Sequence, residues 1–191
     1  MAVGWTDWSD AIAKGVRSVP DVILAHAADV LKRSSIVLTA GNGGSHALAS
    51  HAAQALMKPG YAAGGGTAAV CLSDGVPTLT AHANDEGWES ALVNVAEPFF
   101  RHMEKDTDSY TAGTGTLWLF SSSGKSKNIV ALARTGLAAR FRVVAFTGFE
   151  GEPLKSLATV SIHVASNDYE VVEPVHCALL HRAQYHLRAI T

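Results

Sequence analysis

The chain has 191 residues and a formal net charge of −2, which excludes the broad positive field that nucleic acids and anionic membranes require. Hydrophobic residues make up 48% and charged residues 17%, which excludes a disordered chain. The two cysteines, Cys71 and Cys177, are too few for a disulfide framework and are typical of free thiols in a reducing compartment. We therefore expect one cytoplasmic domain that binds neither nucleic acid nor membrane.

The first 33 residues predict two helices. Residues 1–10 lack the basic and apolar regions of a signal peptide, and no stretch of about 18 apolar residues predicts a membrane span. Thr6 or Ser9 is expected to cap the first helix, and Pro20 opens the second. The second helix carries an apolar stripe, which either joins the core or forms a subunit interface.

From Ser34 onward, segments typical of strands alternate with segments typical of helices. The expected strands are 36–40, 68–72, 117–120, 142–146 and 160–164. The expected helices are 46–57, 77–83, 88–103, 127–139 and 169–190. The polar segment 104–115 is expected to be a surface loop. This alternation predicts an α/β three-layer sandwich, in which helices cover both faces of a five-stranded parallel sheet.

Two glycine- and serine-rich turns follow the first and third expected strands. They are Gly41-Asn42-Gly43-Gly44-Ser45 and Ser121-Ser122-Ser123-Gly124-Lys125-Ser126. Ligands of parallel sheets bind at the carboxyl ends of the strands, and each turn precedes a helix whose free N–H groups attract anions. Serine hydroxyls add donors, and Lys125 is expected to add charge from the rim. The turns predict a phosphate site, although such residues also cap helices without binding anything. Neither turn has the spacing of a Walker A or a dinucleotide-binding motif.

Further motifs occur in a fixed order along the chain. They are His51 after the first turn, Thr80-Ala81-His82-Ala83-Asn84-Asp85-Glu86-Gly87, Thr147-Gly148, and Glu173-x-x-His176 with His181. Together with the two turns, they resemble the signature segments of bacterial sedoheptulose-7-phosphate isomerases, which have the sugar-isomerase (SIS) fold. The resemblance runs from about Ser34 to the C-terminus.

This resemblance implies a single flavodoxin-like SIS domain over 1–191, with 1–33 as an oligomer contact. It implies a ketose–aldose isomerase that acts on sedoheptulose 7-phosphate or a similar sugar phosphate through an enediol. It also implies one zinc ion per active site and a homotetramer with sites at subunit interfaces. The implied substrate-binding residues are Asn42, Gly43, Gly44, Ser45, Asn84, Asp85, Ser121, Ser122, Ser123 and Ser126. The implied metal ligands are His51, Glu173 and His181, and the implied catalytic residues are His181 and Glu173.

The chain departs from the family pattern at two positions. Ala55 replaces a family glutamate, and Glu173 replaces a family glutamine. The carboxylate missing from one helix is therefore present on another. Glu173 and His181 are eight residues apart, which separates them by about 12 Å along a straight helix. Cys177 lies between them and has a thiol suited to zinc, but a buried inert cysteine is the commoner outcome.

Two other functions remain open at this stage. The loss of the carboxylate at Ala55 favours a non-catalytic adaptor, since one SIS-fold relative is a tetrameric partner of the bacterial replication initiator. The changed position of the carboxylate suits an isomerase of altered substrate in specialised sugar biosynthesis equally well. Three other histidines, His46, His82 and His176, either contact the ligand or only pack and form hydrogen bonds.

Overall fold

The computed structural model describes residues 4–58, 67–105 and 115–188. Its sheet contains strands β1 (Ile36–Ala40), β2 (Ala68–Cys71), β3 (Gly115–Phe120), β4 (Arg142–Thr147) and β5 (Val160–His163). The strands lie in the order β2-β1-β3-β4-β5, and every neighbouring pair is parallel. The predicted five-stranded parallel sheet is confirmed. Most of the expected loop at 104–115 lies outside the described residues.

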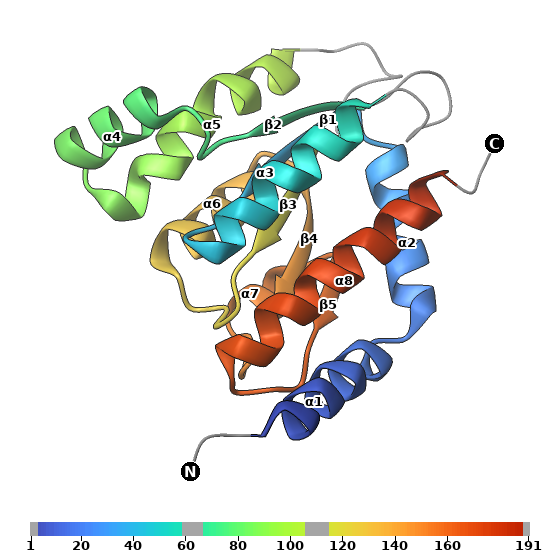
Figure 1. The fold of residues 1–191 in the computed structure, drawn as a ribbon. Helices are drawn as coiled ribbons and strands as arrows, with labels where there is room; N and C mark the ends of the chain where they lie inside the picture. The colour runs from blue at the N-terminus through green and yellow to red at the C-terminus, as the bar shows by residue number, and fades with distance from the viewer. Residues whose placement is uncertain (1–3, 59–66, 106–114, 189–191) are drawn as a thin grey trace.

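Helices cover both faces of the sheet, as Figure 1 shows. One face carries α1 (Trp5–Ser18), α2 (Asp21–Lys32), α3 (Gly44–Met57) and α8 (Tyr169–Arg188). The other carries α5 (Trp88–Lys105), α6 (Lys127–Ala138) and the short α7 (Leu154–Leu157). The remaining helix, α4 (Val76–Asp85), packs against α5 and has no buried residue. Within the described residues, none of the helices combines the length and apolar character that a membrane span needs.

The two layers follow from the alternation of side chains along each strand. In β3, Trp118 and Phe120 pack into the core under α3 and α8, whereas Leu117 and Leu119 pack under α5 and α6. All six residues of β3 are buried, as expected for a central strand with helices on both faces. The apolar strand sequences therefore fix the middle layer of the sandwich.

Several details differ from the sequence-based expectations. The first helix begins at Trp5 after Gly4, without a side-chain cap, so the expected Thr6 or Ser9 cap is wrong. The Ser9 hydroxyl instead donates to the Thr6 carbonyl oxygen inside the helix. Helix α3 begins at Gly44, two residues before the expected start. Helix α7 was not expected, because four residues are too short to show a helical period.

The strand order places the two glycine- and serine-rich turns side by side. The chain passes from β1 to the edge strand β2 and then returns to the other side of β1 as β3. This reversal leaves a crevice at the carboxyl ends of β1 and β3, which is where ligands of open parallel sheets bind.

Candidate functional site

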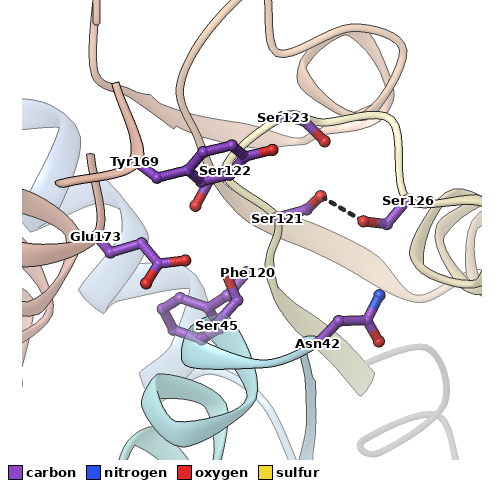
Figure 2. A pocket seen from close by; sticks show the side chains of 9 residues that line it. All are labelled: Asn42, Ser45, Phe120, Ser121, Ser122, Ser123, Ser126, Tyr169 and Glu173. Atoms are coloured by element: carbon purple, nitrogen blue, oxygen red, sulfur yellow. Dashed lines mark hydrogen bonds between the residues drawn. The ribbon is translucent and has the colours of Figure 1, made fainter. Parts of the chain in front are cut away.

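A cavity of about 180 Å³ lies between the turns after β1 and β3 and the start of α8 (Figure 2). Its lining residues are Asn42, Ser45, Phe120, Ser121, Ser122, Ser123, Ser126, Tyr169 and Glu173. Seven of these were predicted from the sequence as site residues; Phe120 and Tyr169 were not. The predicted Gly43 and Gly44 belong to the same turn as Asn42 and Ser45.

The serine turn after β3 presents hydroxyl groups to this cavity. The Ser121 hydroxyl donates to the Ser126 hydroxyl at 3.3 Å, and the Ser123 hydroxyl accepts from the Lys125 backbone N–H at 3.2 Å. The Ser122 carbonyl accepts from Gly148 N–H at 2.7 Å, which ties the turn to the end of β4. The Ser122 hydroxyl is buried and has no hydrogen-bond partner among the described residues. A buried hydroxyl normally has a partner, so Ser122 is available to donate to a ligand.

Two helix N-termini add positive potential. Helix α3 follows Gly43 and helix α6 follows Ser126, and neither residue caps its helix with a side chain. Gly43 has a φ of 55°, a backbone conformation that glycine adopts without strain. The free N–H groups of both first turns favour an anion at this position.

Lys125 does not direct its charge to the serine turn. Its ammonium group donates to the Glu150 carboxylate at 2.6 Å, and both side chains are exposed. This hydrogen bond holds the pKa of the Glu150 carboxyl below its ordinary value. The attraction for an anion therefore comes from backbone N–H groups and hydroxyls rather than from the lysine.

Glu173 supplies the carboxylate of the cavity. Its side chain extends from α8 toward the serine turn and the start of α3 (Figure 2). The carboxylate lies so close to Gly44 that a Cβ atom at position 44 would collide with it. Glycine at this position therefore leaves room for the carboxylate at the positive end of α3.

A pair of side-chain amides joins the two turns behind the cavity. Asn42 Nδ2 donates to Asn128 Oδ1, and Asn128 Nδ2 donates to Asn42 Oδ1, both at 2.9 Å. Asn128 is only 1% exposed, and its Oδ1 also accepts from Ile129 N–H. Sequence reasoning did not identify Asn128; the available signal was an asparagine in the first turn of the helix after the serine turn.

His51 and His181 meet about two helical turns away from Gly44 and Glu173. Their rings pack edge to face, with centroids 4.9 Å apart, and neither residue lines the cavity. Burial, together with the nearby His181 and Lys58, lowers the pKa of His51. Ala55, which replaces the family glutamate, is buried one turn further along α3.

The histidine pair alone is too small a set of ligands for zinc. A catalytic zinc site needs about three protein ligands, and the two imidazoles provide two. Within the described part of one chain, no third histidine, cysteine, aspartate or glutamate joins them in a group of ligand distance. Glu173, the third predicted ligand, is on the cavity side of α8. One chain alone thus does not complete the predicted zinc site.

The other predicted residues lie elsewhere. Asn84 and Asp85 are exposed at the end of α4, where the Asn84 amide donates to Asp85, and neither lines the cavity. His82 pairs with Glu86. His176 is fully buried, and its Nε2 donates to the Thr147 carbonyl oxygen at 3.1 Å, which supports the turn after β4. His46 contacts Ser73 on the side of α3 that faces β2.

Comparisons with known proteins agree with this architecture. The family model described as the SIS domain matches residues 21–148. A phosphoheptose isomerase of Hamiltonella defensa is 30% identical over 160 residues, which cover 80% of this chain and 69% of that protein. The lincomycin biosynthesis protein LmbN of Streptomyces lincolnensis is 32% identical over 157 residues, which cover 77% of this chain and 52% of that protein.

A solved structure shows the same fold. The phosphoheptose isomerase GmhA of Neisseria gonorrhoeae superposes with a TM-score of 0.77 at 21% identity, and the match covers 97% of this chain and 95% of that one. The family match over residues 21–148, the similarity to these relatives and the serine turn at the strand reversal lead to one conclusion: this chain belongs to the SIS domain family.

Proposed function

We propose that the protein is a ketose–aldose isomerase of a phosphorylated sugar, with sedoheptulose 7-phosphate or a similar sugar phosphate as substrate. One observation carries the proposal: the Glu173 carboxylate and the serine turn after β3 face the same cavity. Relatives named phosphoheptose isomerase support the same class of substrate.

The phosphate group would bind at the serine turn. Hydroxyls of Ser121, Ser122 and Ser123 and the first turn of α6 would donate to its oxygens, as helix N-termini do in other phosphate sites. The unpartnered Ser122 hydroxyl would gain its missing hydrogen bond. The phosphate would thereby orient the sugar, so that its carbonyl end approaches Glu173.

Glu173 would move the proton. Its carboxylate would take a proton from the hydroxyl-bearing carbon beside the carbonyl, which gives an enediol, and return that proton to the former carbonyl carbon. A second group must exchange a proton with the two oxygens. The resemblance implies His181 for this role, which stays a prediction, because within one chain His181 does not line the cavity. The adaptor alternative is less favoured, because a binding scaffold has no need of a carboxylate in its cavity.

Zinc at His51, Glu173 and His181 stays a prediction. When bound, zinc would polarise the sugar carbonyl. Because the described part of one chain supplies only the two imidazoles in close contact, the proposed proton transfers use protein groups alone.

The predicted homotetramer, with sites at subunit interfaces, is part of the proposal. The cavity of about 180 Å³ is smaller than the roughly 300–1,000 Å³ typical of ligand pockets, and walls from a neighbouring copy would extend it. Helices α1 and α4 have no buried residue, and exposed apolar side chains lie on or beside them at Trp5, Val76 and Trp88. A neighbouring copy that covers these helices would bring Asn84 and Asp85 to another subunit's substrate. We place the enzyme in the cytoplasm, in agreement with its free thiols.

An altered substrate is the second candidate. The similarity to LmbN and the carboxylate at position 173 favour an isomerase of specialised sugar biosynthesis. Such an enzyme would keep the serine turn and Glu173, and would differ in the walls that contact the sugar hydroxyls.

The direct test is steady-state turnover of sedoheptulose 7-phosphate by the purified protein, with metal analysis and with or without added zinc. Turnover supports the proposed reaction, and its dependence on zinc decides whether the predicted metal takes part. Turnover of a different sugar phosphate would favour the second candidate. Binding of sugar phosphates without turnover of any of them would contradict the enzyme proposal.

A further inference from the structure

A second group of chemically reactive side chains lies at the edge of the sheet, outside the cavity. Cys71 ends the edge strand β2, Asp74 lies in the turn that leads to α4, and His46 is in the first turn of α3. One ligand atom from each residue lies within 4.8 Å of the other two. His46, which precedes Cys71 by 25 residues, thus brings a nitrogen close to a sulfur and an oxygen from the end of β2 and the turn after it.

The spacing of these atoms suits a tetrahedral metal ion. Zinc bonds of about 2.0–2.3 Å place neighbouring ligand atoms about 3.3–3.8 Å apart. Cys71 Sγ lies 3.9 Å from His46 Nδ1, and His46 Nε2 lies 3.5 Å from Asp74 Oδ1. Because a bound ion uses one ring nitrogen, the His46 imidazole would have to rotate to complete the set.

Neighbouring hydroxyls hold the three ligands in place. The Ser50 hydroxyl donates to Asp74 Oδ2 at 3.0 Å, which leaves Oδ1 facing His46. The Ser73 hydroxyl lies 2.8 Å from His46 Nδ1 and 3.5 Å from Cys71 Sγ. Such outer hydrogen bonds orient ligands in metal sites, and their loss weakens metal binding about 10–100-fold.

The exposure pattern distinguishes this group from core packing and from a nucleophilic triad. The His46 and Asp74 side chains are 37% and 49% exposed, so an ion can reach them and a water molecule can fill a fourth position. Cys71 is buried, and burial raises the pKa of its thiol, which disfavours an activated nucleophile. A bound metal ion reverses this, since coordination removes the thiol proton outright.

We propose that His46, Cys71 and Asp74 bind a divalent transition metal ion of the zinc class, through nitrogen, sulfur and oxygen ligands. The ion would tie the end of the edge strand β2 to α3 and to the turn before α4. The site is separate from His51 and His181, and it does not depend on the isomerase reaction.

Cobalt titration of the chelator-treated, full-length protein tests this site. Tetrahedral Co²⁺ bound by a thiolate has a sulfur-to-metal absorption band in the near ultraviolet. We expect this band in the wild-type protein at one ion per chain, its displacement by Zn²⁺, and its loss in Cys71→Ser. Asp74 is exposed, so Asp74→Asn should fold normally and bind Co²⁺ at least tenfold more weakly, and Ser50→Ala about tenfold more weakly.

Cys177→Ser is the matched control, because Cys177 is the other free cysteine and lies between Glu173 and His181 on α8. We expect it, like His181→Ala, to keep the thiolate band. Circular dichroism checks that each variant is folded. Absence of the band from the wild type, its loss in Cys177→Ser, or unchanged Co²⁺ affinity in folded Asp74→Asn would overturn the proposal.

Discussion

The two ends of the α3–α8 helix pair differ in what they can do. At the cavity end, Glu173 lies over Gly44 between two strand-to-helix turns, and the Ser122 hydroxyl has no hydrogen-bond partner among the described residues. About two turns along the same helices, His51 and His181 touch only through their rings, beside the buried Ala55. The cavity end carries a carboxylate and an unpartnered hydroxyl, whereas the histidine end carries two imidazoles in contact.

The difference shows how helical rise divides a set of motif residues. The motif groups Glu173, His51 and His181 into one site, but eight residues along a helix correspond to about 12 Å. Within one chain, the residues that the resemblance groups together therefore lie at two separate heights along the α3–α8 pair. We expect the cavity end alone to carry the phosphate and the base.

The largest expected effect concerns the packing that supports the cavity end. Burial lowers the pKa of His176 from 6.5 to about 4. Between these values the unfolded chain binds the proton and the folded chain does not, so stability is full above pH 6.5 and is lost as pH falls toward 4. The loss is about 2 kcal/mol at pH 5 and reaches about 3 kcal/mol near pH 4. Urea unfolding at pH 7 and pH 5 should show it.

His176→Gln isolates this contribution, because glutamine keeps a hydrogen-bond donor for the Thr147 carbonyl and does not titrate. We expect the variant to lose less stability between pH 7 and pH 5 than the wild type. The pKa values of His51 and His163 are also lowered, so some dependence on pH should remain. An unchanged slope would show that His176 is protonated normally in the folded protein.

Gly44→Ala tests the position of the Glu173 carboxylate rather than its charge. The new Cβ would push the carboxylate away from the start of α3, and displacement of a catalytic group by about 1 Å costs about 100-fold in rate. We expect kcat to fall by this factor while inorganic phosphate still competes with substrate. Gly75→Ala is the control, since a Cβ at position 75 meets nothing within 4 Å. Equal kcat values for the two variants would show that the position of the Glu173 carboxylate does not affect the reaction.

Ser122→Ala removes the unpartnered hydroxyl of the cavity. A hydrogen bond to a charged group contributes about 1.5–3 kcal/mol, so affinity for phosphate should fall at least about tenfold. Isothermal titration with inorganic phosphate measures this loss. Ser161→Ala is matched to it, because the Ser161 hydroxyl on β5 is also buried and unpartnered but lies outside the cavity lining. If both variants bind phosphate like the wild type, the serine turn is not the phosphate site.

The smallest effect is expected for Lys125→Ala. Lys125 pairs with the exposed Glu150, and solvent screens this charge from the cavity. We expect KM for the sugar phosphate to change by about twofold or less. A tenfold rise in KM would show that Lys125 attracts the phosphate group from the rim of the site, as the sequence suggests.

The central sheet and the two turns were predictable because local patterns determine them. Five apolar runs gave five strands, and the glycine and serine turns fell where β1 and β3 end. Because the strand order reverses at β1, these two turns meet, and Ser45 and Ser122 line one cavity. The short α7 and the uncapped start of α1 were missed, since neither leaves a clear periodic or capping signal.

Contacts that depend on tertiary packing were harder to predict from the sequence. The Asn42–Asn128 pair joins residues 86 positions apart, and the Tyr169 ring reaches the cavity from the start of α8. The grouping of Cys71 with His46 required the pairing of β2 with β1. The roles of Asn84 and Asp85 stay predictions, because a neighbouring copy would have to bring them to the substrate.

Isomerisation of sedoheptulose 7-phosphate in D₂O, followed by proton NMR for the wild type and Glu173→Gln, tests the central claim most directly. An enediol reaction with Glu173 as the base predicts that the wild type incorporates deuterium at the carbon beside the carbonyl. Glu173→Gln should do so at least about 100-fold more slowly while still binding phosphate. Incorporation by Glu173→Gln at the wild-type rate would contradict the role of Glu173 as the base.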